Sequence, residues 1–272
     1  MANAGDINAG YMGIVHAGGR TIRCTGMDIA PLQNPLFFDH VIGLNDTTGG
    51  SGTKGESPGT VQPQKTLMRP GPISVGGSIS FPETEGSAGA FFEEAVNGGY
   101  LSGIEVYYDC KKGRSFSECR VDSYNMTITA GDMINTSVSF VGKYSYPGGG
   151  SPTYVKPEKF ITWDVVEVNG SGYETVYGFN ININNGVTPI YFGDTGDMHP
   201  ADLRIGIQTV TGNILVYNDP GIDYVDRPTS ISVNYPGGGF QVKCLLSPSK
   251  ITGSVSPSIV SVPFTGIDSP FS

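Results

Sequence analysis

The sequence predicts an all-β chain built from two tandem β-sandwich domains, and three observations support this prediction. Turn-forming residues are abundant, with 40 glycines and 19 prolines among 272 residues, and charged residues make up only 15%. Short runs rich in Val, Ile, Thr and Tyr alternate apolar with polar residues between these turns, which is typical of half-buried strands. Several of these runs recur in the same order in the second half of the chain. Many short strands arranged in two copies of one unit follow from these features.

The internal repeat consists of three blocks whose offset falls along the chain. The offset is 154 in the first block (Thr21 to Thr175), 135 in the second (Arg69 to Arg204) and 124 in the last part of the third (Val138 to Val262). Alternating strands resemble one another for generic reasons, but three blocks in one order favour a duplication. The aligned segments are 21–38 with 175–192, 69–81 with 204–216, 104–106 with 231–233, and Val138-x-Phe140-x-Gly142 with Val262-x-Phe264-x-Gly266.

The change in offset shows where the first half carries extra residues. Between the first two blocks the surplus is 154 − 135 = 19 residues, and it falls in segment 42–67, which is rich in Gly, Ser, Thr and Pro. We expect a long exposed loop there. The Pro/Gly-rich segment 146–158 has no periodicity and is predicted to link a first domain, residues 1–145, to a second, residues 159–272.

One helix is expected, near residues 86–97, in a second insertion of the first half. Thr84 or Ser87 is predicted to cap it, Glu83 suits its positive N-terminal end, and Gly98 is expected to stop it. Its apolar stripe would pack on a sheet and consists of Phe91, Phe92, Ala95 and Val96.

The charge pattern argues against several classes of partner. The formal net charge is −9, and there is no run of five Lys or Arg residues, so sequence-specific nucleic-acid binding is disfavoured. An acidic surface still suits DNA that must slide past without sticking. No stretch of 18 apolar residues occurs, and the N-terminus lacks the pattern of a secretory signal. We therefore expect no membrane segment and folding in a reducing cytoplasm.

The four cysteines are expected to be free thiols in that compartment. A bond between Cys110 and Cys119 across a hairpin is the alternative, and it stays open at this point. The chain has no CxxC spacing, so a structural zinc site has no support.

Residues for catalysis are not grouped in any recognisable pattern. The histidines are scattered, the G-x-S-x-G motif is absent, and two pairs of neighbouring acids fit a turn and a solvated helix face better than a glycosidase site. The single Trp163 weakens a sugar-binding interpretation. We expect no enzyme, no cofactor and no metal. The residues considered are His16, His40, His199, Asp194, Asp197, Glu93 and Glu94.

Three segments resemble the tail tube (major tail) proteins of tailed bacteriophages. Residues 158–168 followed by 177–185 are similar to the strand pair that opens many such domains. Residues 199–217 carry the family's spacing of small and apolar residues, and residues 126–142 are similar to its closing strands. These segments touch both halves of the chain, although the helix is plain only in the first half.

The resemblance implies two tube-like domains whose sheets join those of neighbouring subunits into a closed cylinder. Family tubes use rings of six such domains, so this chain would form trimeric, pseudo-sixfold rings that stack into a conduit for DNA ejection, with an acidic lumen. Expected partners are the protein itself, tape-measure and tail terminator proteins, a sheath if the tail is contractile, and passing DNA, with no membrane. The protein would belong to the virion tail and be assembled in the host cytoplasm. Residues of the 42–67 loop that a neighbouring subunit or ring would order are Asn45, Thr53, Lys54, Glu56 and Gln62.

Other functions remain open at this point. A tail terminator, a distal tail protein, a capsid decoration protein or a secretion-tube protein would share the ring-forming architecture. The second half could also be an immunoglobulin-like decoration domain, although its matching closing strands argue against this. An enzyme or a carbohydrate-binding module is the third class.

Overall fold

The computed structural model describes residues 13–17, 19–33, 36–37, 68–69, 72–101, 103–109, 112–148, 159–169, 176–192, 198–217, 228–247 and 259–271. This part of the chain is nearly all strand, with one α-helix and one 3-10 helix, which confirms the all-β prediction. The elements are β1 (Gly13–Ala17), β2 (Arg20–Cys24), β3 (Gly26–Gln33), β4 (Leu36–Phe37), β5 (Met68–Arg69), β6 (Ile73–Pro82), α2 (Phe92–Asn97), β7 (Tyr100–Leu101), β8 (Ile104–Asp109), β9 (Lys112–Thr129), β10 (Asn135–Gly148), η2 (Trp163–Val165), β11 (Glu167–Asn169), β12 (Val176–Asn184), β13 (Thr188–Ile190), β14 (Asp202–Arg204), β15 (Thr209–Tyr217), β16 (Pro228–Tyr235), β17 (Gly238–Leu246) and β18 (Ile259–Phe271).

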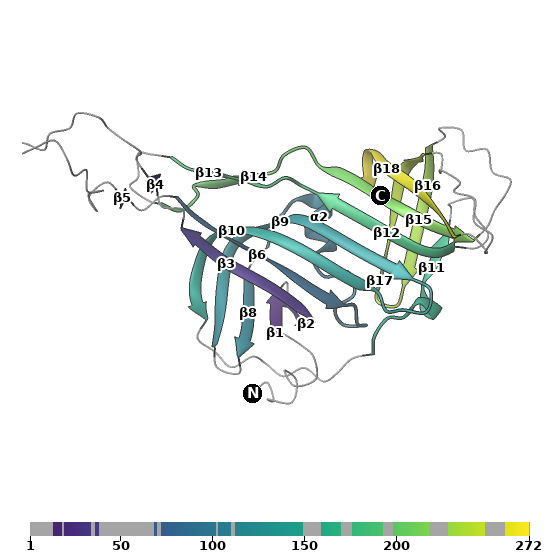
Figure 1. The fold of residues 1–272 in the computed structure, drawn as a ribbon, viewed down its shortest axis with the longest axis horizontal. Helices are drawn as coiled ribbons and strands as arrows, with labels where there is room; N and C mark the ends of the chain where they lie inside the picture. Colours follow the sequence, from purple (N-terminus) through teal and green to yellow (C-terminus); the bar gives the residue numbers. More distant parts are fainter. Residues whose placement is uncertain are drawn as a thin grey trace, which may run out of the picture.

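Most strands belong to one large sheet that curls through both halves of the chain (Figure 1). Its main path runs β11-β16-β17-β18-β15-β12-β9-β10-β6-β3, and β7 and β8 branch from β9. Strand β9 joins the halves, because its residues 123–127 pair with β10 on one edge and with β12 on the other. The two halves therefore share one continuous sheet.

The strands of each half pair in the same order. The first half has the order β3-β6-β10-β9-β8, and the second half has β12-β15-β18-β17-β16. The register between the second and third strands also agrees, since Ile79 lies opposite Val138 and Ile214 lies opposite Val262, the pairs that the repeat offsets relate. Each half also carries a two-stranded ribbon between its first two strands, β4–β5 in one and β13–β14 in the other.

The core lies on one face of the sheet, as period-2 alternation requires. Cross-strand neighbours form apolar rows that continue from one half into the other. Burial of each large apolar side chain in these rows contributes roughly 1.5–3 kcal/mol to the stability of the fold. One such row joins buried residues of β6, β10, β9, β12 and β15: Ile79, Val138, Tyr124, Ile183 and Val210.

Helix α2 is shorter than predicted, and its predicted caps were wrong. Phe91 precedes it with a left-handed backbone (φ 66°), and Gly89 has φ 68°, so the right-handed helix cannot begin before Phe92. Ser87 Oγ instead accepts a hydrogen bond from the backbone N–H of Thr84 at 2.9 Å. Gly98 ends the helix as expected, with φ 62° and its N–H donating to the carbonyl of Glu94 at 2.8 Å. The predicted stripe does pack on the core.

The segment before β12 also differs from the prediction. Residues 158–168 and 177–185 were expected to pair as strands, but β11 pairs with β16, and β12 pairs with β15 and β9. Bridges from Phe160 to Thr84 and from Thr162 to Met133 hold residues 160–162 on the first half instead. Strand β10 extends to Gly148, three residues into the predicted linker 146–158.

The cysteines that the structure describes, Cys24, Cys119 and Cys244, are buried free thiols, and Cys110 lies outside the described residues. Burial raises the pKa of the Cys119 thiol to about 12. Within the described residues, the structure contains no helix long and apolar enough to cross a membrane.

Candidate assembly surfaces

One region of the face of the sheet opposite the core is polar and almost uncharged. Three cross-strand rows of Ser, Thr and Asn cross it, and the single ionisable side chain in these rows is the exposed Asp28. The rows are Asp28-Ser78-Ser139-Ser123-Asn184-Thr209, Gly26-Ser80-Ser137-Asn125-Asn182-Thr211-Thr265 and Pro82-Asn135-Thr127-Asn180-Asn213-Pro263. We call this surface the polar face.

Side chains of the polar face bond across the strands. Ser80 Oγ donates to Ser137 Oγ at 3.1 Å, and the hydroxyls of Ser123 and Ser139 lie 2.7 Å apart. At the junction of the halves, Asn180 Nδ2 donates to Thr127 Oγ1 at 3.0 Å. The sequence signal for this surface was the alternation of hydroxyl and amide residues with apolar ones. That alternation predicts the strands but not which of their polar residues meet in one surface.

The ribbon β13–β14 packs over the first half of the chain. The backbone N–H of Ile73 donates to the carbonyl of Met198 at 2.9 Å, and Tyr191 Oη donates to the carbonyl of Ile73 at 3.1 Å. The rings of Tyr144 and His199 lie 5.0 Å apart. The second half therefore reaches the start of β6 and the middle of β10.

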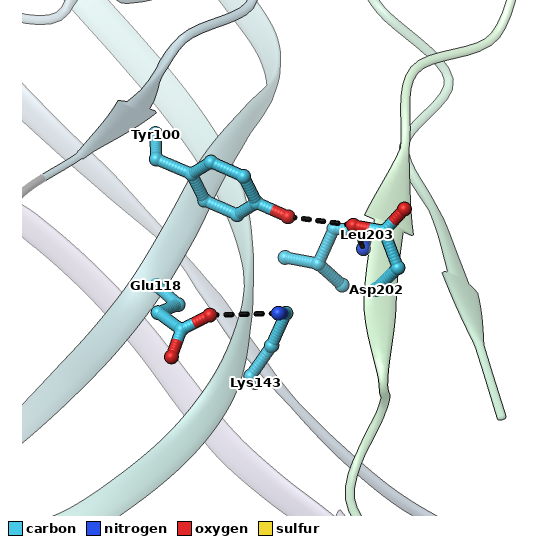
Figure 2. Close-up of polar contacts among 5 residues, drawn as sticks. All are labelled: Tyr100, Glu118, Lys143, Asp202 and Leu203. Atoms are coloured by element: carbon cyan, nitrogen blue, oxygen red, sulfur yellow. Dashed lines mark hydrogen bonds and ion pairs between the residues drawn. The ribbon is translucent and has the colours of Figure 1, made fainter. Parts of the chain in front are cut away.

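A cluster of polar side chains fixes the base of this ribbon (Figure 2). Tyr100 Oη and the backbone N–H of Leu203 each donate to Asp202 Oδ1 at 2.8 Å, and these two bonds, Tyr100 first, lower the pKa of Asp202. Lys143 Nζ lies 2.7 Å from Glu118 Oε2, and this hydrogen bond raises the pKa of Lys143. Glu118 and Tyr100 are exposed, so the cluster fixes geometry more than it adds stability.

Two amide side chains attach α2 to the sheet at the junction of the halves. The fully buried Asn185 donates from Nδ2 to the carbonyls of Ala95 at 2.9 Å and Val121 at 3.0 Å. Gln208 Nε2 donates to the carbonyls of Ala95 and Val96 at 3.0 Å and to Asn185 Oδ1 at 2.8 Å. The last carbonyls of α2, which have no partner within the helix, are satisfied in this way.

We expect Asn185→Ala to lower the free energy of unfolding by about 2 kcal/mol, because the buried carbonyl of Val121 loses its side-chain donor and Gln208 loses an acceptor. Chemical denaturation measures this loss. Asn182→Ala, on the polar face of the same strand, is the matched control and should change stability by less than about 0.5 kcal/mol. Equal losses in the two variants would show that Asn185 does not anchor the helix.

The predicted loop residues cannot be placed on these surfaces. Asn45, Thr53, Lys54, Glu56 and Gln62 all lie outside the described residues, as do Asp194 and Asp197. The structure describes the base of the loop, where Leu36 lies opposite Arg69 and Phe37 opposite Met68. Among the described residues, no group of three or more His, Cys, Asp and Glu is arranged to hold a metal ion.

Comparison with known proteins agrees with this architecture. No curated protein matches the chain. A family model described as phage tail tube protein matches residues 26–266, from the first residue of β3 into β18. The match therefore includes every strand of the polar face and both halves of the sheet. The chain belongs to the phage tail tube protein family.

Proposed function

We propose that three copies of this chain form a pseudo-sixfold ring and that such rings stack into a hollow conduit for DNA ejection. Family membership makes the chain a structural subunit of the virion tail. The ring stoichiometry is supported by the equal strand order of the halves, which lets one chain supply two equivalent units. We accordingly infer two tube-like domains, residues 1–145 and 159–272, related by duplication.

The observation that best supports the conduit is the composition of the polar face. Its rows contain no Lys or Arg, and Asp28 is their single carboxylate, so they offer no cation to hold a phosphate. We propose that this face lines the bore. Ser, Thr and Asn side chains keep such a wall wet while it neither binds nor strongly repels DNA. The acidic lumen implied by the family resemblance is then limited, in these rows, to one carboxylate per chain.

Other tail components follow from the same proposal. The expected partners are tape-measure protein inside the tube, a terminator at its end and, in a contractile tail, a sheath around it. Assembly would take place in the host cytoplasm. Passing DNA would make no sequence-specific contact. No catalytic role is proposed.

Electron microscopy of the purified protein in negative stain tests the proposal. We expect rings and stacked tubes with a central channel. A strictly monomeric species at high concentration would contradict it. Single closed rings or caps that never stack would favour a tail terminator, distal tail or decoration protein instead.

The loop candidates Asn45, Thr53, Lys54, Glu56 and Gln62 are proposed to contact the next subunit or ring. Deletion of residues 45–60 is expected to leave the unfolding transition unchanged and to abolish stacking, because none of the described strands includes these residues. Circular dichroism checks the fold, and microscopy counts tubes against rings. Normal tubes from the deletion variant would refute the role of the loop.

A further inference from the structure

Residues 159–163 lie on the first half of the chain although they precede the strands of the second half, and we call them the strap. The chain continues from the strap through η2 to β11, which pairs with β16 at the far end of the sheet path (Figure 1). The strap therefore ties that end of the sheet to the first half. Among the described residues, four backbone hydrogen bonds seat it: Glu85 N–H to the carbonyl of Lys159 at 3.1 Å, and Ile161 N–H to the carbonyl of Glu83, Ile134 N–H to the carbonyl of Ile161 and Trp163 N–H to the carbonyl of Asp132, each at 3.0 Å.

Glu83 is central to this contact. Its backbone N–H donates to the carbonyl of Ile134 at 2.9 Å, and its carbonyl accepts from Ile161 N–H. Since Ile134 N–H donates to the carbonyl of Ile161, the three residues are bonded pairwise in a closed ring. All three side chains are buried, and Thr136 Oγ1 and Ser87 Oγ donate to the carboxyl group of Glu83. A movement of Glu83 towards water would break the bond that seats Ile161 in the core.

Three ionisable side chains from other strands interact with Glu83. Arg20 lies in β2, Tyr124 in β9 and Tyr235 in β16. Burial raises the pKa values of both tyrosines, so they stay neutral between pH 6 and pH 9, and the guanidinium group keeps its charge. In this group only Glu83 changes its charge over that range, because burial raises its pKa to about 8. Further charged residues of the adjoining segments are exposed: Glu85, Asp132, Lys159 and Asp164.

We propose that the strap stays seated on the first half only while the carboxyl group of Glu83 is protonated, and that ionisation releases it. A carboxylate buried at this position would lose its hydration, and two hydroxyl donors do not replace it. Movement of residues 83–85 towards solvent restores the hydration and breaks two of the four backbone bonds of the strap. This device belongs to the fold of a single chain and does not depend on the proposed ring.

The strap should open more readily than the sheet junction between the halves. Its seat consists of the four backbone bonds given above, whereas the junction pairs residues 178–184 of β12 with residues 123–129 of β9. Segments held by few backbone bonds open locally, at free energies below that of global unfolding. We therefore expect the sheet to remain intact when the strap is released.

Trp163 reports the state of the strap, because it is the single tryptophan of the chain and packs, partly buried, against the core. The seated strap holds a proton on Glu83 that the released strap does not, so rising pH favours release. We expect the acrylamide quenching constant of Trp163 fluorescence to rise at least about threefold between pH 6 and pH 9, with its midpoint near the Glu83 pKa of about 8. The far-UV circular dichroism of the sheet should not change over this range.

Variants of two neighbouring carboxyl groups make this experiment specific. Glu83→Gln should abolish the transition and keep Trp163 shielded at pH 9, since an amide does not ionise. The exposed Glu85→Gln is the matched control and should keep the midpoint of the parent protein. A Trp163 that stays shielded in the parent protein would overturn the proposal. So would a transition of parent size in Glu83→Gln, or one that coincides with loss of the β-sheet signal.

A reciprocal effect separates release of the strap from ionisation alone. Ile161→Val removes one methylene group from the buried anchor of the strap, which favours the released state and should lower the midpoint by about 0.5–1 pH unit. Ile181→Val removes the same group from the buried face of β12 and should leave the midpoint within about 0.2 pH unit of the parent. An unchanged midpoint in Ile161→Val would mean that ionisation and release are independent events, which contradicts the proposed device.

Discussion

The free energy of unfolding is expected to fall by up to about 5 kcal/mol between pH 4.5 and 8, because Glu83 is protonated in the folded state. Each unit by which folding raises the pKa of this group corresponds to about 1.4 kcal/mol. Glu83 has 0% exposure, and burial raises its pKa from 4.5 to about 8 against the opposing effects of its hydrogen bonds and of Arg20. Thr136 Oγ1 donates to its carboxyl group at 2.8 Å and Ser87 Oγ at 3.3 Å. These two hydrogen bonds do not replace the water that a charged Glu83 carboxylate would lose on burial, so the protonated form is favoured.

The sign follows from proton binding. Between the unfolded pKa of 4.5 and the folded value of about 8, the native protein holds a proton on Glu83 that the unfolded chain has released. This contribution to stability is complete below pH 4.5 and is lost as pH rises through 8. Tyr124 and Tyr235, which also interact with Glu83, have raised pKa values and stay neutral across this window.

The variant Glu83→Gln isolates the effect, since an amide has a similar shape and does not titrate. Denaturant unfolding at pH 5 and pH 8 should show a strong loss of stability in the parent protein and little change in the variant. Glu85→Gln, an exposed position two residues along, is the control and should keep the parent's pH dependence. If the stability of Glu83→Gln fell with pH as steeply as that of the parent protein, this carboxyl group would not be the source of the pH dependence.

Glu83 also shows where sequence reasoning stopped. Its position before Thr84, Ser87 and an apolar stripe is typical of a helix N-terminus, so the sequence predicts a carboxylate that interacts with the positive end of a helix. The left-handed backbone at Gly89 and Phe91 starts the helix later. Glu83 directly follows β6, where its backbone bonds to Ile134 and Ile161 hold it in the core beside Thr136, which is 53 residues away. Local pattern could not reveal this, because the burial depends on a distant strand.

The strands themselves were predictable, because alternation and turn residues are local signals. The repeat blocks also fall on strands that pair in the same order in both halves, although no sequence pattern showed that β9 would accept β12 on its free edge. The polar face follows from that junction. The alternation of Asn, Ser and Thr can be read from the sequence. Which of these residues become neighbours in continuous rows depends on the register between strands that are far apart in the sequence.

The second large effect is expected at Gly212, where the backbones of neighbouring strands come close together. A Cβ at this position would overlap the backbone oxygen of Asn180 and the ring of Phe264. Phe264 has 1% exposure and stacks on Phe179 with ring centroids 5.5 Å apart, so it has little room to move. Gly212→Ala should therefore lower the free energy of unfolding by about 3 kcal/mol, at the upper end of the usual cost of overpacking.

The counterpart of Gly212 in the first half, Gly77, allows a graded test. There the added Cβ would lie 2.7 Å from the backbone oxygen of Asp28 and 3.2 Å from Ile29 Cγ1, a milder overlap, so Gly77→Ala should cost about 1–2 kcal/mol. Gly99 has no atom within 4 Å of the added Cβ, and Gly99→Ala should stay within about 0.5 kcal/mol of the parent. Chemical denaturation of the three variants measures the order of their losses in free energy of unfolding. Asp28 and Asn180 belong to the strands that the repeat relates, so a loss of stability in both Gly77→Ala and Gly212→Ala would mean that the two halves use the same close backbone approach. A Gly212→Ala protein as stable as Gly99→Ala would show that β12 and β15 are not packed this closely.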